Sequence, residues 1–519
     1  MRLVALAVVT LVAAGVVWRA QSEDDPAASA SRQPGDAPAT TAVAPPDTSV
    51  LVSTDETVPV DTTAALPPFD GWVNPASFGR PYGTTVQGML TFRGNPTRSY
   101  YGEGPVPAAP RILWRFPASG GLCHTSSDQH GARVWCGTGW TGQANVWTNP
   151  KDNKLWLAFG AYDAAYHFLD PATGQRMLPD FPTGDIDKGS ATVDPDGFPL
   201  YYAGSRDNNL RVIALDRDTP TELWRLPANA VSPTMWNNDW DGAPLVIDDY
   251  LFEGGENSQF HIVKLNRGYG PDGNVTVSPQ LVFHAPGWDQ ELLSNIGDKD
   301  VSIENSVAIV GSTVYFANSG GLVQGWDISS LEAGGTPTRV FRFWTGDDTD
   351  ASVVADDQGY LYVASEYERK NARSKEVGQL MKLDPRNPDN PIVWSYHDEQ
   401  IGNAGSAGMW STPAVHDDLV VTTTNYGQVI GLDRATGAER WKFHLAGPVW
   451  QSPVIVDDTL IQGDCLGVLR AYDVSDTMVQ PPVKWELNIG GCIESTPTVW
   501  QGRIYFGTRA GGFYAIGDA

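Results

Sequence analysis

Basic residues are scarce in this chain of 519 residues. Lysine and arginine together number 35, against 61 aspartates and glutamates, and the formal net charge at pH 7 is −26. A surface of this sign repels the phosphates of a nucleic acid and the head groups of an anionic bilayer. The composition therefore excludes these two classes of partner and leaves cations, basic proteins and neutral ligands.

Several motifs of common catalytic sites are also absent. The sequence has no H-E-x-x-H zinc motif, no G-x-S-x-G nucleophile elbow and no C-x-x-C-H haem attachment motif. The first of its four cysteines is Cys123, so a lipid-modified N-terminal cysteine is excluded. Apolar residues at helical spacing are missing after the first twenty residues, whereas 54 glycines, 38 prolines and 19 tryptophans are typical of a turn-rich, all-β protein.

Two segments precede the expected folded part. Residues 1–19 place Arg2 before an apolar run that ends at Trp18, which predicts an export signal that is either cleaved or kept as a membrane anchor. Residues 20–66 are rich in Ala, Pro, Thr, Ser and Asp, which predicts a disordered linker. We expect an exported chain, either anchored in the cell membrane and facing outside, or secreted or periplasmic, and touching the membrane only through its N-terminal segment.

The rest of the chain repeats itself. WQSPVIVDDTLI, residues 450–461, is nearly restated as WSTPAVHDDLVV from Trp410 and as ESTPTVWQGRIY from Glu494. A second motif, seen in GLDRATGAERW at 431–441, follows each copy. Its Asp accepts turn N–H bonds, and its Trp gives the next strand a large packing surface. The Asp position recurs at Asp170, Asp216, Asp327, Asp384, Asp433, Asp473 and Asp518, with Asn266 in the remaining place.

Eight units of four short strands predict an eight-bladed β-propeller over 67–519. The last unit has no outer strand because the chain ends at Ala519, whereas RILWRF at 111–116 precedes the first unit without a partner. We therefore predict that this N-terminal strand completes the last blade and closes the ring. The alternative, two packed sandwiches, leaves the unmatched strand unexplained.

The turn motif (DRATGAERW, DPATGQRML, DRDTPTELW) and the opening FRGNPTRSYYGEGP resemble the pyrroloquinoline quinone (PQQ) repeat proteins. The resemblance implies one of two kinds of protein. Periplasmic quinoprotein dehydrogenases hold PQQ and Ca²⁺ in the funnel of the propeller and use an Asp as base. Cofactor-free members act as extracytoplasmic scaffolds, like the lipoprotein subunit of the outer-membrane β-barrel assembly machine.

Alignment of the inner strands predicts which residues line the funnel entrance. Four carboxylates in one ring favour a divalent cation, and Ca²⁺ suits an all-oxygen site. The alternative is that acidic loops occur on every face of so acidic a chain. The aligned residues are Lys188, Asp241, Glu304, Asp350, Trp410, Trp450 and Glu494, with His124 for the poorly aligned first blade. The candidate metal ligands are Asp241, Glu304, Asp350 and Glu494.

Tryptophans near the same entrance are candidates for holding a planar cofactor or a sugar ring. They are Trp240, Trp410 and Trp450, with Trp236 nearby. The alternative is that they pack between blades.

The cysteines bear on both the fold and the activity. The dehydrogenases that the chain resembles commonly carry two adjacent cysteines beneath PQQ, and no Cys-Cys occurs here. Cys123 is expected to begin the inner strand of the first blade and Cys136 to end the neighbouring strand, while Cys465 and Cys492 fall in loops of adjacent blades. We predict two structural disulfides, Cys123–Cys136 and Cys465–Cys492, which suit an exported chain.

The sequence thus favours a non-catalytic binding or scaffold protein of the cell envelope, monomeric, that takes a protein or envelope ligand at one propeller face. The alternative is a PQQ- and Ca²⁺-dependent dehydrogenase of alcohols or sugars, with Asp241, Glu304 and Asp350 as ligands and either Glu304 or Asp350 as the base. A third possibility is hydrolysis of a polysaccharide by an acid pair.

Overall fold

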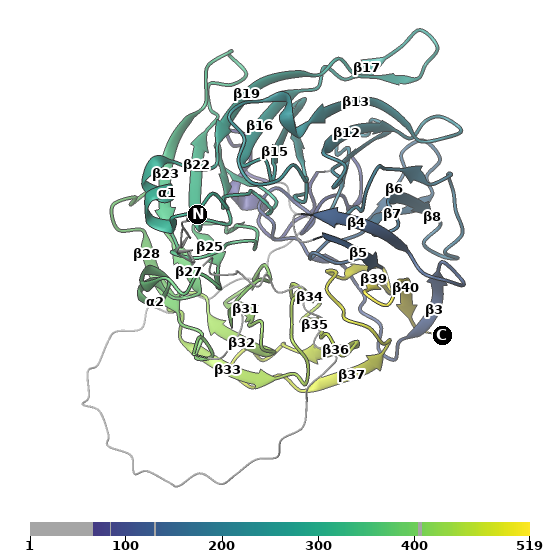
Figure 1. The fold of residues 1–519 in the computed structure, drawn as a ribbon. Coiled ribbons are helices and arrows are strands. Elements are labelled where there is room, and N and C mark those ends of the chain that lie inside the picture. Colours follow the sequence, from purple (N-terminus) through teal and green to yellow (C-terminus); the bar gives the residue numbers. More distant parts are fainter. Residues whose placement is uncertain (1–65, 84, 129–130, 403–406, 519) are drawn as a thin grey trace, which may run out of the picture.

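Eight sheets surround a central axis in the computed structural model, which describes residues 66–83, 85–128, 131–402 and 407–518 (Figure 1). The prediction of an all-β, eight-bladed propeller is confirmed. The described residues contain two short α-helices, α1 (Gln290–Ile296) and α2 (Ala372–Val377), and two 3-10 helices, η1 (Pro75–Ser77) and η2 (Ala228–Ala230). None of these helices has the length and apolar character needed to cross a bilayer. The expected signal and all but the last residue of the expected linker, residues 1–65, lie outside the described residues.

The first four blades are built in chain order, and among these only blade 1 has a fifth, innermost strand. Blade 1 contains β1 (Gly88–Met89), β6 (Asn145–Thr148), β7 (Leu155–Ala161), β8 (Ala165–Leu169) and β9 (Phe181–Pro182). Blade 2 contains β10 (Thr192–Val193), β11 (Leu200–Ala203), β12 (Asn209–Ala214) and β13 (Thr221–Pro227). Blade 3 contains β14 (Leu245–Ile247), β15 (Tyr250–Gly254), β16 (Gln259–Lys264) and β19 (Gln280–Pro286). Blade 4 contains β20 (Ala308–Val310), β21 (Thr313–Phe316), β22 (Leu322–Asp327) and β23 (Thr338–Trp344).

The next three blades follow the same plan. Blade 5 contains β24 (Val354–Ala355), β25 (Leu361–Ala364), β27 (Leu380–Leu383) and β28 (Ile392–Tyr396). Blade 6 contains β30 (Ala414–His416), β31 (Leu419–Thr423), β32 (Gln428–Asp433) and β33 (Glu439–His444). Blade 7 contains β34 (Val454–Val456), β35 (Thr459–Gly463), β36 (Val468–Asp473) and β37 (Val483–Asn488).

Blade 8 joins the two ends of the described chain. Its strands, in spatial order, are β2 (Gly102–Glu103), β38 (Thr498–Trp500), β39 (Arg503–Thr508), β40 (Gly512–Gly517) and β3 (Arg111–Phe116). Strand β3 pairs antiparallel with β40, with Arg111 opposite Gly517 and Phe116 opposite Phe513. The last blade therefore takes its outer strand from residues 111–116.

Three two-stranded sheets lie outside the blades. They are β4 (Cys123–Asp128) with β5 (Gly131–Cys136), β17 (Gly268–Tyr269) with β18 (Val275–Thr276), and β26 (Glu366–Tyr367) with β29 (Ala407–Gly408). The expectation that Cys123 begins the inner strand of blade 1 is wrong, because the β4–β5 hairpin is an insertion and β6 holds the second place from the axis, beside the two-residue β1. Both predicted disulfides, Cys123–Cys136 and Cys465–Cys492, are present.

The Ser/Thr of the repeated inner strand links neighbouring blades around the axis. In blade 5 the backbone N–H of Ser352 donates to Oγ1 of Thr412 at 2.9 Å, and the N–H of Thr412 donates to Oγ of Ser452 in blade 7 at 3.0 Å. Three further links of this kind are Gln143 N–H to Ser190 Oγ, Ala243 N–H to Ser306 Oγ, and Ser306 N–H to Ser352 Oγ. The motif is repeated because a short hydroxyl at this place satisfies a buried N–H of the adjacent blade.

The Asp-x-x-Thr-Gly turn makes a second contact between blades, at the outer edge. Oδ1 of Asp433 accepts the N–H groups of Ala435 and Thr436, which fixes the turn. Gly437 has a φ of +72°, and a Cβ placed on it would lie 2.6 Å from the ring of Trp394 in blade 5. Glycine is needed here both for its backbone conformation and because the indole of the preceding blade packs against it.

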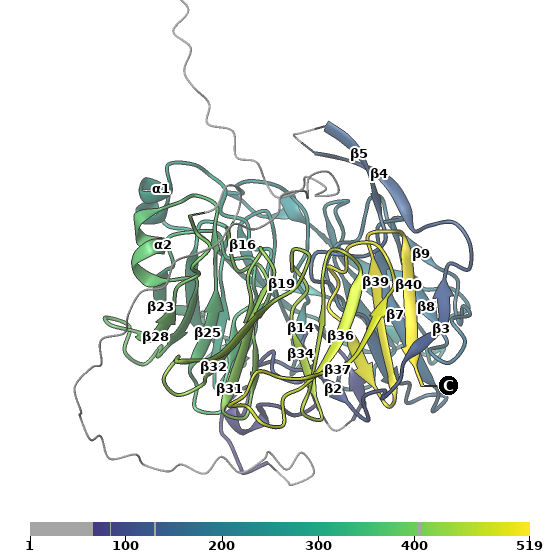
Figure 2. The same cartoon turned by 90° about the horizontal axis from the view of Figure 1, so that it is seen from below.

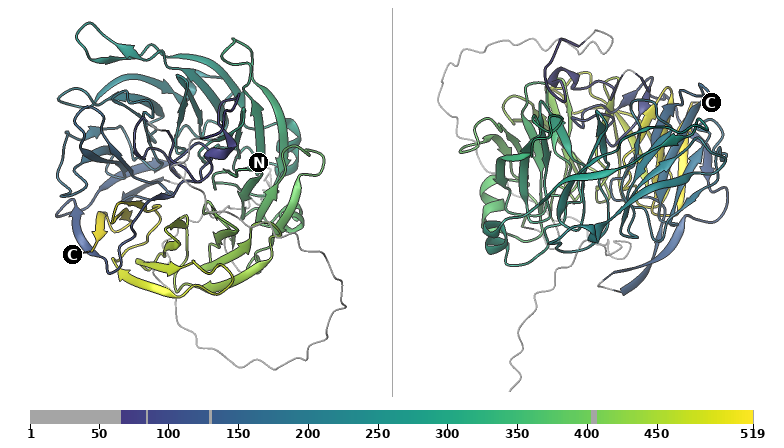
Figure 3. Two further views of the ribbon diagram at one scale, coloured as in Figure 1. Left: turned by 180° about the vertical axis from the view of Figure 1, so that it is seen from behind. Right: turned by 90° about the horizontal axis from the view of Figure 1, so that it is seen from above.

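Two faces of the propeller can be told apart. The face that carries α1, α2 and the β4–β5 hairpin is named the entrance face (Figure 2). The N-terminal described segment, drawn in purple, runs across the opposite face, named the plug face (Figure 3).

Residues 91–101, named the plug, are buried and close the axis from the plug face. The guanidinium of Arg93 donates to the carbonyls of Thr412 (2.6 Å), Pro413 (2.7 Å) and Pro453. That of Arg98 donates to the carbonyls of Val307 and Ala243, both at 2.8 Å. The plug thus satisfies carbonyl groups of the inner strands of blades 3, 4, 6 and 7, which would otherwise be buried without donors.

Candidate functional site

A small cavity lies on the axis between the plug and the entrance face and is named the axial cavity. Phe92 lines it from the plug, and Trp140 and Trp410 line it from the entrance side. Its volume is about 10 Å³, which is room for about one water molecule. The other lining residues are Thr141, Ser190, Asp241, Glu304, Asn305, Ser306, Asp350 and Ser352.

Three tryptophans cover the entrance side of the axial cavity. The rings of Trp140 and Trp410 meet edge to face at 5.1 Å between centroids, and those of Trp410 and Trp450 do so at 5.6 Å. The indole N–H of Trp410 donates to Oδ2 of Asp350 at 2.9 Å. Because these rings contact one another and a carboxylate, they leave no open slot between them for a further flat ring.

Lys188 is the charged centre of the site. Its Nζ lies 2.7 Å from Asp241, 2.9 Å from Glu256 and 3.4 Å from Asp239, and all four side chains are buried. The same ammonium lies 4.2 Å from the centroid of the Trp140 ring, within range of a cation–π interaction. The three carboxylates are close enough together to hold a metal ion, but Lys188 already supplies a positive charge at that place.

Lys188, Asp239, Asp241 and Glu256 are together named the Lys188 cluster, and this cluster has fewer positive than negative charges. Arg206 adds a second cation through Asp239, at 3.1 Å, so two cations face three carboxylates. Burial raises the pKa of Asp241 well above its usual range, although Lys188 opposes this, and burial and Glu256 raise that of Asp239. Burial would also raise the pKa of Glu256, but Lys188 and a hydrogen bond with Asp241 outweigh it and lower that pKa. The excess of negative charge and the burial of the site favour protonation of Asp239 or Asp241 at neutral pH, which would offset that excess.

Lys188 remains charged in this setting. Burial alone would lower its pKa, but Asp241, Glu256 and Asp239 outweigh burial and raise the pKa well above its usual value. Lys188 therefore carries its positive charge in the site at neutral pH.

On the other side of the axial cavity, Glu304 and Asp350 have no lysine or arginine partner among the described residues. Oε1 of Glu304 accepts hydroxyl hydrogen bonds from Ser302 at 2.6 Å and Ser319 at 3.2 Å. Oδ1 of Asp350 is buried and has no hydrogen-bond partner within the described ranges. Burial and the neighbouring carboxylates raise the pKa of both side chains well above their usual ranges. This half of the cavity can hold either a shared proton or a hard cation.

The structure brings together only part of the predicted entrance ring. Four of its members line the axial cavity, namely Asp241, Glu304, Asp350 and Trp410. Lys188 and Trp450 lie beside it, in contact with Asp241 and Trp410 respectively. Glu494 instead pairs with Arg509 at 3.0 Å.

Two other predicted residues also lie elsewhere. Trp240 lies in the hydrophobic core between blades 2 and 3, with its ring 5.0 Å from that of His261. His124 lies on the β4–β5 hairpin, so the alignment that gave it to blade 1 is wrong.

Sequence reasoning missed three kinds of residue. Trp140 was missed because the first blade was aligned wrongly. When the inserted β4–β5 hairpin is left out of the alignment, GTGWTGQANVW at 137–147 matches AGMWSTPAV at 407–415, and Trp140 aligns with Trp410. Glu256 lies in a turn between the second and third strands, outside the inner-strand alignment. Arg93 and Arg98 belong to the motif FRGNPTRSYYGEGP, but nothing in the sequence near them indicates that they close the axis.

Comparisons with known proteins support the family and the fold. The family model described as outer membrane protein assembly factor BamB matches residues 376–516. No curated protein matches the chain by sequence.

Among solved structures, quinohemoprotein alcohol dehydrogenase from Comamonas testosteroni is 13% identical, with a TM-score of 0.52, and the match covers 83% of this chain and 81% of that one. BamB from Moraxella catarrhalis is also 13% identical, with a TM-score of 0.38, covering 80% of this chain and 99% of that one. The computationally designed Ika8 protein is 13% identical, with a TM-score of 0.43, covering 70% and 93%. At such identities the dehydrogenase match is evidence for the fold alone.

The repeated turn motif, the eight blades and the family match agree with one another. The chain has the eight-bladed β-propeller fold, and residues 376–516 match the PQQ-like family model.

Proposed function

We propose that this protein is a non-catalytic binding or scaffold protein of the cell envelope, held outside the cytoplasm, and that it binds a protein or envelope ligand through its entrance face as a monomer. The observation that carries the proposal is the closed axis. The plug fills the axis from one side, and three tryptophans and the Lys188 cluster fill it from the other. A funnel of this kind offers its outer loops, and not its interior, to a partner.

PQQ does not fit the residues that are present. Pockets that hold ligands of this size have volumes of about 300 Å³ or more, whereas the axial cavity has about 10 Å³. The tryptophans that would have to stack on a quinone contact one another instead, and Asp241 is paired with Lys188 at 2.7 Å. The dehydrogenase alternative is therefore the weaker reading of this site.

The entrance face offers a surface for a partner. The β4–β5 hairpin projects from this face (Figure 2) and carries Val134, which is 66% exposed. Trp236 and Leu466 are exposed apolar side chains in loops of the same face. The hairpin is held at its base by the Cys123–Cys136 disulfide and by Trp135, whose ring lies within 6 Å of the guanidinium groups of Arg206 and Arg509. A fixed arm with exposed apolar groups is suited to protein contact.

The envelope location rests on three observations. The two disulfides are expected in an oxidising compartment. The matched family is described as an outer membrane assembly factor, and the apolar run of residues 1–19 is the pattern that predicts an export signal or anchor. We propose the anchored form, with the entrance face free to meet other envelope components.

Site-specific photo-crosslinking tests this proposal. A photoreactive amino acid replaces Val134 on the entrance face or Met478, which is 64% exposed on a plug-face turn, in the full chain expressed in its own cells. We expect discrete crosslinked products from position 134, absent from position 478. Equal products from both positions, or none from 134, would contradict the proposed binding face.

A second candidate is Ca²⁺ binding in the axial cavity, favoured by the unpartnered Oδ1 of Asp350. Asp241, Glu304 and Asp350 would supply the oxygen ligands. Titration of the full chain with CaCl₂ should then raise the melting temperature in wild type and in Glu494→Gln, whose carboxylate lies outside this cavity, but not in Asp350→Asn. An identical response in all three proteins would exclude the axial cavity as the Ca²⁺ site.

A further inference from the structure

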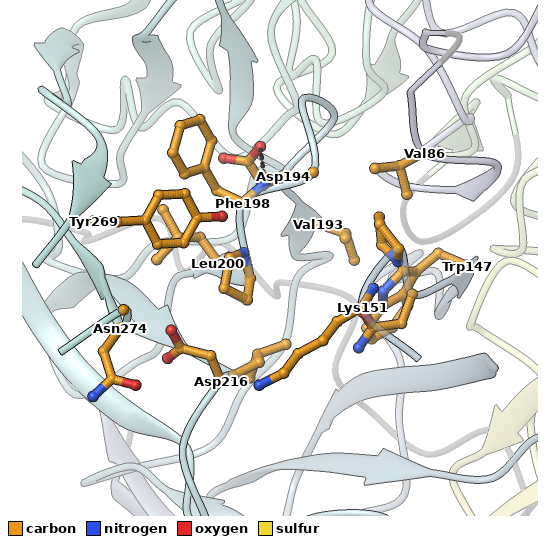
Figure 4. A pocket seen from close by; sticks show the side chains of 16 residues that line it. Val86, Trp147, Lys151, Val193, Asp194, Phe198, Leu200, Asp216, Tyr269 and Asn274 are labelled. Atoms are coloured by element: carbon orange, nitrogen blue, oxygen red, sulfur yellow. Dashed lines mark hydrogen bonds between the residues drawn. The ribbon is translucent and has the colours of Figure 1, made fainter. Parts of the chain in front are cut away.

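A larger pocket lies on the plug face, away from the axis, between blades 1 and 2 and beneath the β17–β18 hairpin of blade 3 (Figure 4). It is named the side pocket. Its volume is about 360 Å³, within the usual range for small-ligand sites. Its floor is formed by buried aliphatic side chains, which include Val193, Leu200 and Leu215.

The wall contributed by blade 3 is an insertion into the blade plan. The segment that links the third and outer strands is a short turn in blade 6, at 434–438, but in blade 3 it spans 265–279 and contains the β17–β18 hairpin. This hairpin is fastened to blade 2, because Val275 N–H donates to Oδ2 of Asp216 at 2.6 Å and Arg217 donates to the carbonyl of Val275 at 2.8 Å. The pocket is therefore a built feature and not a by-product of the repeat.

Aromatic rings form two opposite sides of the side pocket. Phe198 and Tyr269 stack on each other with centroids 5.5 Å apart, and Trp147 lies across the pocket from them (Figure 4). The guanidinium of Arg267 lies 4.9 Å from the Phe198 ring and supports it from behind. Tyr269 is 58% exposed, so its ring forms part of the mouth.

Hydrogen-bond donors and acceptors line the remaining side of the side pocket. Figure 4 shows the Lys151 ammonium and the Asp216 carboxylate on the same side of the pocket, with Asn274 beyond them. Asp216 is held in place by Arg217 and by the N–H of Val275, so its free lone pairs are fixed acceptors. Lys151 is exposed and has no ion-pair partner among the described residues, so its N–H groups remain available as donors.

The electrostatics of the side pocket disfavour an anionic ligand. Arg267 is already paired with Asp194 at 2.7 Å and with Asp196 at 2.8 Å, and Arg217 is paired with Asp216. Only Lys151 is left to meet a phosphate or a carboxylate, and Asp216 would repel it. A neutral ligand with many hydroxyl groups has donors for Asp216, acceptors for Lys151 and an apolar ring face for the aromatic side chains.

We propose that the side pocket binds a neutral saccharide ring of a glycan. The pocket lies on the opposite face from the proposed partner surface, and the proposal does not depend on that surface or on the closed axis. It depends on the aromatic sides, on the fixed carboxylate of Asp216 and on the donor Lys151.

The test uses the full chain and four neutral trisaccharides: cellotriose, maltotriose, mannotriose and N-acetylchitotriose. Binding is measured by isothermal titration calorimetry and by the fluorescence of the tryptophans, which include Trp147 in the pocket. The variants are Tyr269→Ala and Lys151→Ala, both at exposed positions, and the control is Met478→Ala, at an exposed turn of blade 7 far along the chain from the pocket. Melting temperatures of all variants confirm that each is folded.

At least one trisaccharide should bind with saturation, and Tyr269→Ala should weaken that binding by about ten-fold or more. Lys151→Ala should weaken it by a smaller factor, and Met478→Ala should leave it unchanged. No saturable binding of any trisaccharide up to about 10 mM would overturn the proposal. Binding that Tyr269→Ala leaves intact would overturn it as well, because the sugar would then lie elsewhere.

Discussion

Replacement of Arg93 by alanine tests the role of the plug. Arg93 is fully buried and donates to the carbonyls of Thr412, Pro413 and Pro453, and its guanidinium lies 4.6 Å from the ring of Tyr101. Burial lowers its pKa to about 10, so it is still charged at neutral pH. Each carbonyl left buried without a donor costs about 1–2 kcal/mol. Three of them give an expected loss of about 3–6 kcal/mol in the free energy of unfolding.

Guanidinium chloride unfolding of the full chain, followed by tryptophan fluorescence, measures this loss. Arg225→Ala is the matched control, because Arg225 is an exposed arginine whose ion pair with Glu222 should contribute less than about 1 kcal/mol. Arg93→Lys should fall between the two, since one ammonium cannot reach three carbonyls in a fork. If Arg93→Ala and Arg225→Ala unfold at the same denaturant concentration, the plug does not hold the blades together.

Three further predictions concern other contacts. Burial would lower the pKa of His167, but its two aspartate partners raise it from 6.5 to about 9. The protonated form thus stabilises the fold fully below pH 6.5, and wild type should lose up to about 3 kcal/mol as pH rises through 9. His167→Gln should lack this loss in a pH series of denaturant melts. Gly437→Ala should cost at least about 1 kcal/mol more than Gly502→Ala, which has a similar positive φ but open space around it, because only the first meets Trp394. Equal melting temperatures would contradict this. Lys188→Met should lower the free energy of unfolding by about 3–5 kcal/mol at neutral pH, and by less at acid pH, where the buried carboxylates become protonated. A loss that is the same at every pH in these melts would contradict the charge balance of the Lys188 cluster.

The fold could be predicted because its signals are local and repeated. An Asp such as Asp433 fixes its own turn, and a Trp such as Trp394 packs against the next turn along, so the motif and its spacing carry the blade plan. The alignment of the repeats failed only in blade 1, because the inserted β4–β5 hairpin has the sequence pattern expected of the first two strands of a blade.

The site could be predicted only in part, because sequence does not give side-chain direction. Trp240 and Asp241 are neighbours in the chain, yet Trp240 packs into the core and Asp241 faces the axial cavity. Glu494 occupies the same position in blade 8 as Asp241 in blade 3, but it forms an ion pair with Arg509, which lies in a turn of the same blade. The plug contacts join residues that are far apart in the chain, such as Arg93 and Pro413, which are 320 positions apart, and no local pattern predicts them.

The side pocket gave no signal in the sequence for a related reason. Tyr269 and Phe198 come from different blades, and neither belongs to a repeated motif. Only the length of the insertion at 265–279 set blade 3 apart.

The most direct test of the closed axis is a titration of the full chain with PQQ, with and without Ca²⁺. Thermal stability and the quinone absorbance are followed, and a quinoprotein dehydrogenase treated in the same way is the positive control. The account predicts no change with PQQ in either condition, whether or not Ca²⁺ alone stabilises the protein. Saturable, Ca²⁺-dependent stabilisation by PQQ would contradict it, because the tryptophans and the Lys188 cluster would then have to open for a cofactor.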